Sequence, residues 1–348
     1  MALGRNALVL REASRLLGAG VSGHVFPGGA ACVAYRHRGS WVYTTAVAGA
    51  LGVQAGRALG PVREHTPYDL ASITKSFVAV AALRMCDEGA LQLDAVATDV
   101  LLDLRTQGAP AVTLEQLLSH RSGLAAWGGL YLDVAHEPGT TAARRWILSE
   151  ASRRLSESNE VMLYSDLGYM LAGEMVARAD GANDGRALAR TVRRRVTEPL
   201  EIHKRVRFAG ALEAEERAEL SRTVAPTERC AWRGRMVRGE VHDENCAALG
   251  GVSGHAGLFG TAEGVAHFGT ALLDSKAGRS DFLAQPTLEH ALAERPGGSY
   301  RLGFDVKSGD TPAAGRRASP STFGHLGFTG TSFWCDPERD VVVVLLTN

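Results

Sequence analysis

A serine and a lysine stand three residues apart at the start of a segment with helical periodicity, DLASITKSFV from Asp69. Three residues is nearly one helical turn, so the hydroxyl of Ser72 and the amine of Lys75 should share one helix face, with the positive end of the helix dipole beneath Ser72. A lysine desolvated at such a place can lose its proton and accept one from the serine, which makes a nucleophile without histidine. Alone, the pair could equally be a helix-capping serine beside a surface lysine.

Two further motifs follow along the chain. Tyr164, Ser165 and Asp166 precede the run LGYMLAGEMV, which places a phenol and a carboxylate on the turn before a predicted helix. Near the end of the chain, GHLGFTG at 324–330 leads into a predicted strand. By itself Tyr164 is better explained as a buried tyrosine with a bonded hydroxyl. The order of the three motifs raises the case for a shared site.

In this order the motifs resemble the Ser-x-x-Lys, Tyr-x-Asn and Lys-Thr-Gly or His-Thr-Gly signature of the serine β-lactamase-related family, which includes class C β-lactamases, DD-peptidases, related esterases and penicillin-binding-protein-like proteins. The resemblance implies that Ser72 is the acyl-accepting nucleophile, Lys75 its proton partner and Tyr164 the base that relays protons to the leaving group. It also implies an oxyanion hole made by the backbone N–H groups of Ser72 and Phe328. Similar phrases run through nearly the whole chain: FPGG at 26–29, TLEQLLSHRSGL at 113–124, VHDENCAALGGVSGHAGLFGTA at 241–262 and GFTGTSFWCDPERDVVVVLLTN at 327–348.

Departures from the signature bear on the substrate. Asp166 replaces the family's Asn and, when ionised, cannot donate a hydrogen bond to a substrate amide carbonyl. Leu326 replaces the central Thr and removes a hydroxyl that would help to bind a substrate carboxylate. His325 replaces lysine and carries positive charge only when protonated. These changes favour ester or small-amide hydrolysis over β-lactam turnover. The expected substrate-binding set is Asp166, His325, Leu326, Gly327, Asp243, Asn245 and Trp127.

The segment 242–255 carries several ligand-type side chains, including Asp243, Asn245 and His255. Its spacing is not that of a helical HExxH motif, and no CxxC supports a metal site. We expect a loop that lines the cleft, with neither metal nor cofactor. The run Gly251-Val-Ser253-Gly-His255 fails the GxSxG nucleophile elbow at its last position, so Ser253 is expected to be a turn residue.

The surrounding elements predict an α+β fold. Two β-rich runs at 30–35 and 40–47 form a predicted hairpin, helical periodicity dominates from Ser72 to about Arg195, and strands return at 300–306, 330–335 and 341–347. Strands at both ends favour one antiparallel sheet built from the two termini, flanked by helices, with an all-helical insertion. The predicted sheet subdomain comprises 1–68 and 250–348, the mainly helical subdomain 69–249, and the active site lies in the cleft between them.

Composition indicates an ordinary globule. Acidic and basic side chains balance at 38 each, so no charge attracts nucleic acid, and no stretch is long and apolar enough for a membrane span. The N-terminus contains Arg5, Arg11, Glu12 and Arg15, which interrupt any export signal, and five scattered cysteines fit reduced thiols. We therefore expect a cytoplasmic protein, or a periplasmic one if a signal was removed before this numbering.

The end of the chain bears on its association. Family members usually finish with a helix packed on the sheet, whereas this sequence stops at Asn348, at the end of its last predicted strand. Either the chain is truncated after Asn348 or one sheet face is less covered, which would favour a homodimer.

Two functions of different class follow. The first is a serine hydrolase that forms an acyl-enzyme on Ser72 and acts on a small ester, amide or peptide substrate. The second is a catalytically silent or slow relative that captures a peptide or sugar fragment in the same cleft. The substitutions at Asp166 and Leu326 keep the second hypothesis open.

Overall fold

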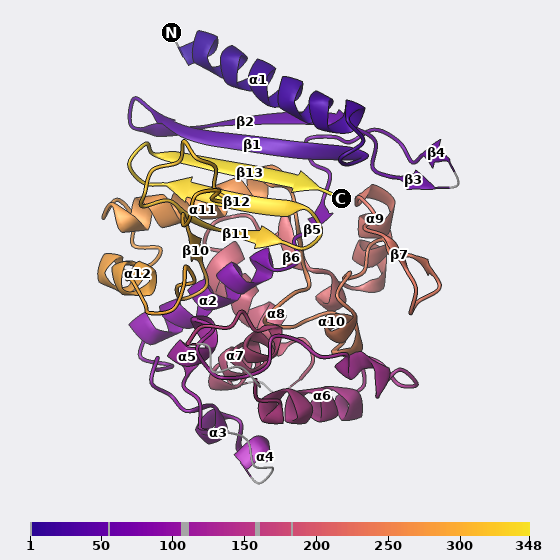
Figure 1. Ribbon diagram of the computed structural model, residues 1–348, viewed down its shortest axis with the longest axis vertical. Helices are drawn as coiled ribbons and strands as arrows, with labels where there is room; N and C mark the ends of the chain where they lie inside the picture. Colours follow the sequence, from indigo (N-terminus) through magenta and orange to yellow (C-terminus); the bar gives the residue numbers. More distant parts are fainter. Residues whose placement is uncertain (1, 55, 106–110, 157–160, 182–183) are drawn as a thin grey trace.

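The computed structural model describes residues 2–54, 56–105, 111–156, 161–181 and 184–348. Its largest sheet has the strand order β10-β11-β12-β13-β1-β2, and every neighbouring pair is antiparallel. The strands are β1 (Gly28–His37), β2 (Ser40–Gly49), β10 (Asp305–Val306), β11 (Phe323–Gly327), β12 (Thr331–Asp336) and β13 (Val341–Thr347). The pairing of β1 with β13, in which Cys32 lies opposite Val344, joins the two ends of the chain at the middle of the sheet. Figure 1 shows this junction, which confirms the sheet predicted from both termini.

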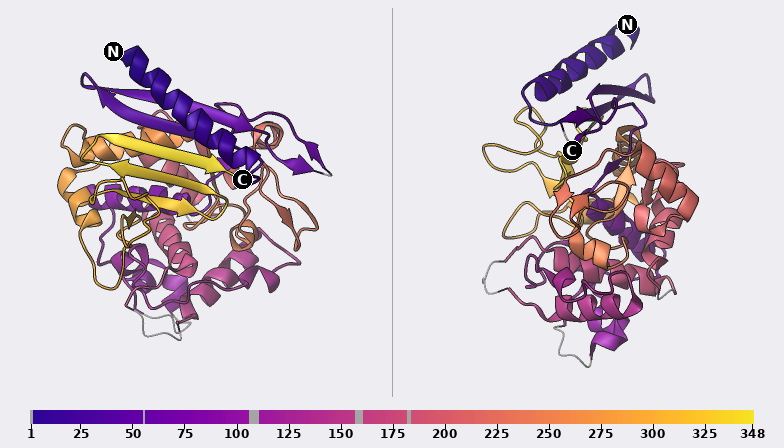
Figure 2. Two further views of the ribbon diagram at one scale, coloured as in Figure 1. Left: turned by 45° about the horizontal axis from the view of Figure 1, so that its top comes forward. Right: turned by 90° about the vertical axis from the view of Figure 1, so that its right-hand side faces the viewer.

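Burial alternates along the central strands, as a sheet with two different faces requires. Ala30, Cys32 and Ala34 of β1 are fully buried, and on this side helix α11 (Ala262–Lys276) packs against β1, β12 and β13. The opposite face carries α1 (Ala2–Ser22), which lies across β1 and β2 (Figure 2). The sheet is therefore the middle layer between two helical layers.

The face under α1 keeps some apolar side chains in contact with solvent. Leu16 of α1 is 60% exposed and Val343 of β13 is 42% exposed. Polar contacts anchor the helix at its first turns, where the side chain of Asn6 accepts hydrogen bonds from the hydroxyls of Tyr35 and Thr44. A single helix thus covers this face only in part.

The remainder of the fold is mainly helical. Its helices are α2 (Ile73–Asp87), α3 (Ala97–Val100), α4 (Leu102–Arg105), α5 (Leu114–Leu118), α6 (Thr141–Arg153), α7 (Asp166–Ala179), α8 (Ala187–Val192), α9 (Ala214–Thr223), α10 (Glu244–Ala248) and α12 (Gln285–Leu292), with short η1 (Leu130–Leu132), η2 (Arg193–Thr197) and η3 (Ala209–Ala211). The capping box predicted at Thr113 and Gln116 begins α5. The α+β fold class is confirmed.

The described residues also form three small sheets, and strands at 206–208, 229–230 and 235–236 lie within the insertion that was predicted to be all-helical. A small sheet joins β5 (Tyr68–Asp69), β9 (Leu258–Gly260) and β6 (Val206–Phe208), and two-stranded sheets join β3 (Val53–Gln54) with β4 (Arg57–Ala58) and β7 (Arg229–Cys230) with β8 (Arg235–Met236). These strands have two or three residues each, too short for a period-two pattern to be visible in the sequence. The division of the chain into two subdomains at residues 69 and 250 stays a prediction.

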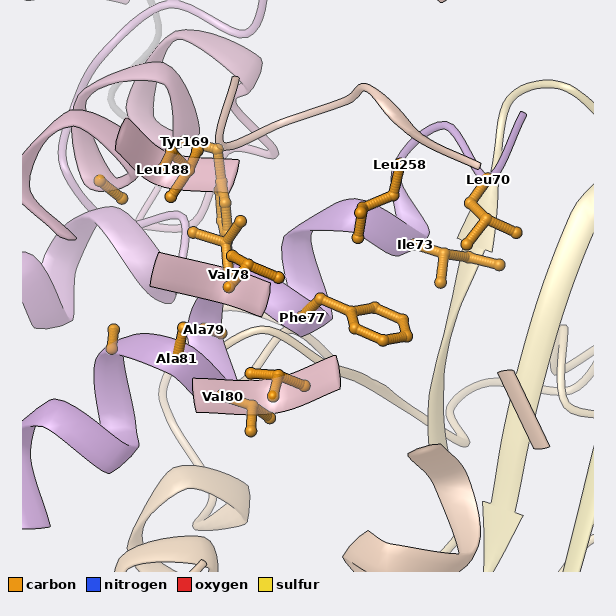
Figure 3. Packing of buried hydrophobic residues seen from close by; sticks show 14 of the residues in the cluster. Leu70, Ile73, Phe77, Val78, Ala79, Val80, Ala81, Tyr169, Leu188 and Leu258 are labelled. Atoms are coloured by element: carbon orange, nitrogen blue, oxygen red, sulfur yellow. The ribbon is translucent and has the colours of Figure 1, made fainter. Parts of the chain in front are cut away.

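Helix α2 runs through the centre of the molecule, between the six-stranded sheet and the other helices (Figure 1). It is buried on nearly all sides, and Figure 3 shows Phe77 and Val78 packed among side chains from neighbouring elements. The hydroxyl of Ser76 donates to the carbonyl of Gly303 at 2.7 Å. Any side chain at Gly303 would meet the Cβ of Ala79 at 2.2 Å, so this close approach requires glycine. The first turn of α2 is consequently held rigidly.

The strand expected at 300–306 is shorter than predicted. Only Asp305 and Val306 pair with β11, and Tyr300 forms an isolated bridge to Asp305. Between them the backbone N–H groups of Leu302 and Gly303 bond to Ala291 and Leu118, which lie outside the sheet. Tertiary hydrogen bonds thus replace the ladder there. Across the described ranges, the helices are too short or too polar to cross a bilayer.

Candidate active site

The hydroxyl of Ser72 and the amine of Lys75 meet at the start of α2. Ser72 is the N-cap residue of the helix, and Nζ of Lys75 donates to Oγ of Ser72 at 2.8 Å. Lys75 is fully buried, and its Nζ also donates to the backbone carbonyl of His255 at 3.3 Å. The structure therefore brings the two groups together as the Ser-x-x-Lys spacing predicts.

Asp166 is the counter-ion of Lys75. Its Oδ1 lies 2.7 Å from Nζ, and its side chain is 21% exposed. Burial on its own would lower the pKa of Lys75, but the charge of Asp166, with contributions from Tyr164, outweighs it and raises that pKa above the usual value. The burial foreseen for Lys75 is present, but so is a carboxylate that favours the charged amine, and the loss of the lysine proton to activate Ser72 stays a prediction.

The turn before Ser72 is strained and held by a buried carboxylate. Ala71 has a φ of +45°, in the left-handed region that disfavours residues with a side chain. The carboxylate of Asp69 accepts from the N–H of Ala71 at 2.9 Å and from the N–H of His242 at 2.6 Å. Burial raises the pKa of Asp69 to about 6, although these hydrogen bonds act in the other direction. Asp69 thus orients the nucleophile, a role that sequence analysis missed although the residue lies within the quoted motif.

Tyr164 lies in a group of aromatic rings above Lys75. Nζ of Lys75 is 4.8 Å from the centre of the Tyr164 ring. The ring of His120 lies 4.4 Å from that of Tyr164, and the ring of Tyr300 lies 4.9 Å from it. Nδ1 of His120 accepts from the N–H of Ser165 at 3.0 Å, and burial, followed by the charge of Lys75, holds the pKa of His120 well below 6.5. His120 is thus neutral and fixes the turn that carries Tyr164.

The third motif forms the end of β11 and its turn. His325 is buried, and its Nδ1 lies 2.6 Å from the carbonyl oxygen of Leu326, to which it donates. Its Nε2 is a buried acceptor without a hydrogen-bond partner among the described residues. Burial and the nearby Lys75 lower the pKa of His325 to about 3. The positive charge that His325 could carry when protonated is therefore absent at neutral pH.

The β11–β12 turn contacts the nucleophile turn directly. The hydroxyl of Thr329 donates to the carbonyl of Asp69 at 2.7 Å, and that of Thr331 to the carbonyl of Leu70 at 3.2 Å. A Cβ on Gly327 would lie 2.6 Å from the Leu70 carbonyl oxygen, so Gly327 permits this close approach. Beyond it, Phe328 is 83% exposed.

The segment expected to line the cleft does so in part. His255 bridges Asp243 and Ser253: its Nε2 lies 2.8 Å from Oδ1 of Asp243, and its Nδ1 lies 2.9 Å from Oγ of Ser253. Burial alone would raise the pKa of Asp243, but His255 and the N–H of Cys246 lower it to about 2. Asn245 is buried away from the cleft, where its side chain bonds the backbone of Gly128 and Tyr131. These contacts account for the ligand-type residues through hydrogen bonds within the protein.

A cleft of about 620 Å³ opens over Ser72. Among the residues predicted for the site, it is lined by Ser72, Tyr164, Asp166, Trp127, Asp243, His325, Leu326 and Phe328, whereas Lys75 lies beneath it and Gly327 and Asn245 do not line it. Its wall also includes His242 and Glu244, from the segment 242–255 that was expected to line the cleft, and Glu228 and Tyr300, which sequence analysis missed because no motif marks them. No lysine or arginine of the described chain lines the cleft. Carboxylates and aromatic rings therefore dominate its surface.

Comparison with known proteins identifies relatives of this chain and solved structures with a similar fold. The chain is 30% identical over 355 aligned residues to Esterase EstB of Burkholderia gladioli, covering 92% of this chain and 86% of the relative. It is 26% identical to an N-acetylmuramyl-L-alanine amidase of Bacillus subtilis, covering 85% of this chain and 71% of the relative. The structure of the octameric penicillin-binding protein homologue from Pyrococcus abyssi superposes with a TM-score of 0.70 at 21% identity, covering 100% of this chain and 74% of that one. The family model for β-lactamase matches residues 13–348. The chain therefore belongs to the β-lactamase family.

Proposed function

We propose that this protein is a serine hydrolase that forms an acyl-enzyme on Ser72 and hydrolyses small esters or amides. The observation that carries the proposal is the contact of 2.8 Å between Nζ of Lys75 and Oγ of Ser72 at the floor of an open cleft. The names of an esterase and an amidase among its relatives support this reaction class. No cofactor or metal is part of the proposal.

The remaining groups have roles that fit acyl transfer. No hydrogen bond within the described residues occupies the N–H of Ser72 or of Phe328, which leaves both able to donate to a carbonyl oxygen that becomes negative as Ser72 attacks. Tyr164 lines the cleft and lies beside the Lys75 ammonium, where its phenol is suited to passing a proton to the leaving group. Removing one oxyanion-hole donor typically costs about 100-fold or more in rate.

The cleft favours substrates without a carboxylate beside the scissile bond. His325 is neutral because its pKa is lowered to about 3, and Leu326 has no hydroxyl to bind an anion. The acidic side chains Glu228, Asp243 and Glu244 line the same cleft. A penicillin carboxylate would meet these groups without a cationic partner, so we expect weak or no β-lactamase activity. Exposed Trp127 and Phe328 offer apolar contacts for the acyl or leaving group.

Covalent labelling tests the proposal directly. A fluorophosphonate and p-nitrophenyl acetate should both react with Ser72, and Ser72→Ala should abolish labelling and turnover. Ser76→Ala is the matched control, because this serine lies about one turn further along α2, where its hydroxyl donates to the Gly303 carbonyl and does not line the cleft. If Ser72→Ala retains full ester hydrolysis, the nucleophile is assigned wrongly. A panel of short-chain esters, D-alanyl peptides and nitrocefin then ranks the substrates.

The same substrate panel distinguishes the proposed hydrolase from the alternative function. A catalytically silent or slow binding protein would form a stable adduct on Ser72 without releasing it. Release of product over many turnovers would contradict that alternative.

Self-association stays a separate prediction. The exposed apolar side chains Leu16 and Val343, on the face of the sheet that α1 covers in part, are where a second copy would bind. Light scattering measures it, and a monomer across the accessible concentration range would contradict it.

A further inference from the structure

We propose that Asp166 is a positioning residue for acylation: its carboxylate holds Lys75 as an ammonium ion against Ser72 and takes up, through that ammonium, the proton that Ser72 loses. The inference rests on the proposed hydrolase function and deepens it. It departs from the role expected for Asp166 on sequence grounds, which was contact with the substrate.

The geometry commits one carboxylate oxygen of Asp166 to the lysine. Oδ1 lies 2.7 Å from Nζ of Lys75, whose other contacts are Oγ of Ser72 at 2.8 Å and the carbonyl of His255 at 3.3 Å. Three oxygen atoms therefore surround a fully buried ammonium group. Two of them accept hydrogen bonds from Nζ, and the third, Oδ1 of Asp166, forms an ion pair with it, which favours the charged amine.

The protein holds the carboxylate in place from its own backbone. Asp166 is the first residue of α7, and its N–H donates to the carbonyl of Ala126 at 2.8 Å. The preceding Ser165 caps the helix through the N–H of Gly168. A carboxylate at the first turn of a helix is stabilised by the helix dipole. The charge that Lys75 faces is thus part of the rigid scaffold.

Among the described residues, the other ionisable groups around Lys75 offer no second counter-ion in direct contact. His120 and His325 are neutral, because burial and the charge of Lys75 lower the pKa of each imidazole. Asp243 interacts with Lys75 through space but contacts His255 instead. The groups that interact with Lys75 from the elements packed around it are Tyr164, Asp166, Tyr169, His120, His325 and Asp243, and Tyr300 packs against Tyr164. Asp166 is the one among them in an ion pair with Nζ.

The proton transfers balance without a neutral lysine. As Oγ of Ser72 bonds to the substrate carbonyl carbon, its proton passes to Nζ while one Nζ proton passes to Oδ1 of Asp166. Lys75 stays an ammonium, Asp166 becomes a neutral acid, and the carbonyl oxygen becomes an oxyanion. When the bond to the leaving group breaks, that group takes a proton through Lys75 or Tyr164, and the carboxylate is restored. In deacylation, water bonds to the acyl carbonyl carbon and its proton passes through Lys75 to Asp166. The bond to Oγ of Ser72 then breaks, the proton returns to Oγ, and the acid is released.

Asp166→Asn should change the pH dependence and not only the rate. Without the carboxylate, burial is left as the dominant influence on Lys75 and lowers its pKa, so the amine becomes neutral within the accessible range and must itself be the base. Labelling of Ser72 by a neutral fluorophosphonate should then fall about 100-fold at neutral pH and recover by about tenfold per pH unit toward alkaline pH. The wild-type profile should be level over the same range.

The experiment compares complete pH profiles of the labelling rate for the wild type, Asp166→Asn, Asp166→Glu and Asp180→Asn. Asp180 is the matched control, since it follows the same helix at its far end and pairs with Arg195 at 3.0 Å. Measurements stay above pH 6.5, because Asp69, whose pKa is about 6, titrates below that in every variant. Melting temperatures confirm that each variant is folded.

The outcomes are distinct. A sloping profile for Asp166→Asn, a level one for Asp180→Asn and restoration of the level profile by Asp166→Glu support the proposal. Parallel profiles for Asp166→Asn and the wild type overturn it, as does the same slope in Asp180→Asn. A change in KM for ester substrates without a change in the labelling profile also overturns it, since Asp166 would then contact substrate only. Labelling that persists in Ser72→Ala refutes the proposed hydrolase function instead, whatever the profiles show.

Discussion

Asp243→Asn isolates the charge of the carboxylate that supports the segment 242–255 at the cleft. Oδ1 of Asp243 lies 2.8 Å from Nε2 of His255, and the carboxylate also caps α10 through the N–H of Cys246 at 2.6 Å. Asparagine caps a helix as well as aspartate and can still accept from His255, so the substitution removes charge while the contacts remain. The pKa of Asp243 is lowered from 3.8 to about 2. At 1.36 kcal/mol per pH unit, this corresponds to about 2.5 kcal/mol of folding stability.

The sign of the effect sets the pH window. A carboxyl whose pKa is lowered by folding stabilises the native state above its unfolded value near 4 and loses this contribution as the pH falls toward 2. Urea unfolding at pH 7 should therefore show Asp243→Asn about 2.5 kcal/mol less stable than the wild type, with the difference shrinking toward zero near pH 2. Asp133→Asn, at an exposed position beyond η1, is the control and should change little. A difference below about 0.5 kcal/mol at pH 7, or one that does not vary with pH, would refute the reasoning.

Three further substitutions probe the nucleophile and its support. Lys75→Ala leaves the Asp166 carboxylate without its partner, so the free energy of unfolding in urea should fall by roughly 3 kcal/mol and labelling by about 100-fold or more; unchanged stability would contradict the buried pair. Gly327→Ala should lower the unfolding free energy by about 1–3 kcal/mol and slow labelling, because the new Cβ would lie 2.6 Å from the backbone oxygen of Leu70. Gly185→Ala is the control: its Cβ would meet nothing within 4 Å, so it should have neither effect. Folding raises the pKa of Asp69 from about 4 to about 6, so the protonated carboxyl favours the native state. In the wild type this contribution to the free energy of unfolding, about 3 kcal/mol, is lost as the pH rises from about 4 to 6. Asp69→Asn should abolish this part of the slope in urea unfolding, and an unaltered slope would show that the group titrates normally.

Much of the fold was predictable because it follows from local periodicity. The strand predicted at 341–347 is observed at Val341–Thr347, and the hairpin predicted at 30–35 and 40–47 is observed as β1 and β2 with slightly longer strands. Alternating burial along strands of this length is visible in the sequence. The small sheets and the interrupted strand at 300–306 were not predictable. The partners of β5, β6 and β9 lie far apart in the chain, and the strands of the other two small sheets have only two residues each, too short for a local pattern.

The three motifs of the site were found from residue types and order, and the structure places Ser72, Tyr164 and His325 around one cleft. The supporting groups escaped notice. Asp69 acts through the backbone N–H of Ala71, and a hydrogen bond to a backbone group leaves no signature in side-chain spacing. Asn245 was expected in the cleft, but its side-chain amide instead donates to the backbone carbonyl of Gly128, next to Trp127.

The sequence by itself determined that a hydroxyl and an amine share one helical face, because a spacing of three residues allows little else once a helix forms. It also determined the order of the motifs and the sheet made by both ends of the chain. Only the tertiary structure decided the charge on those groups. Lys75 stays an ammonium because Asp166 arrives from another helix, and His325 is neutral because the surrounding chain buries it. Protonation depends on desolvation and on charges brought together by folding, and neither quantity exists in the linear chain.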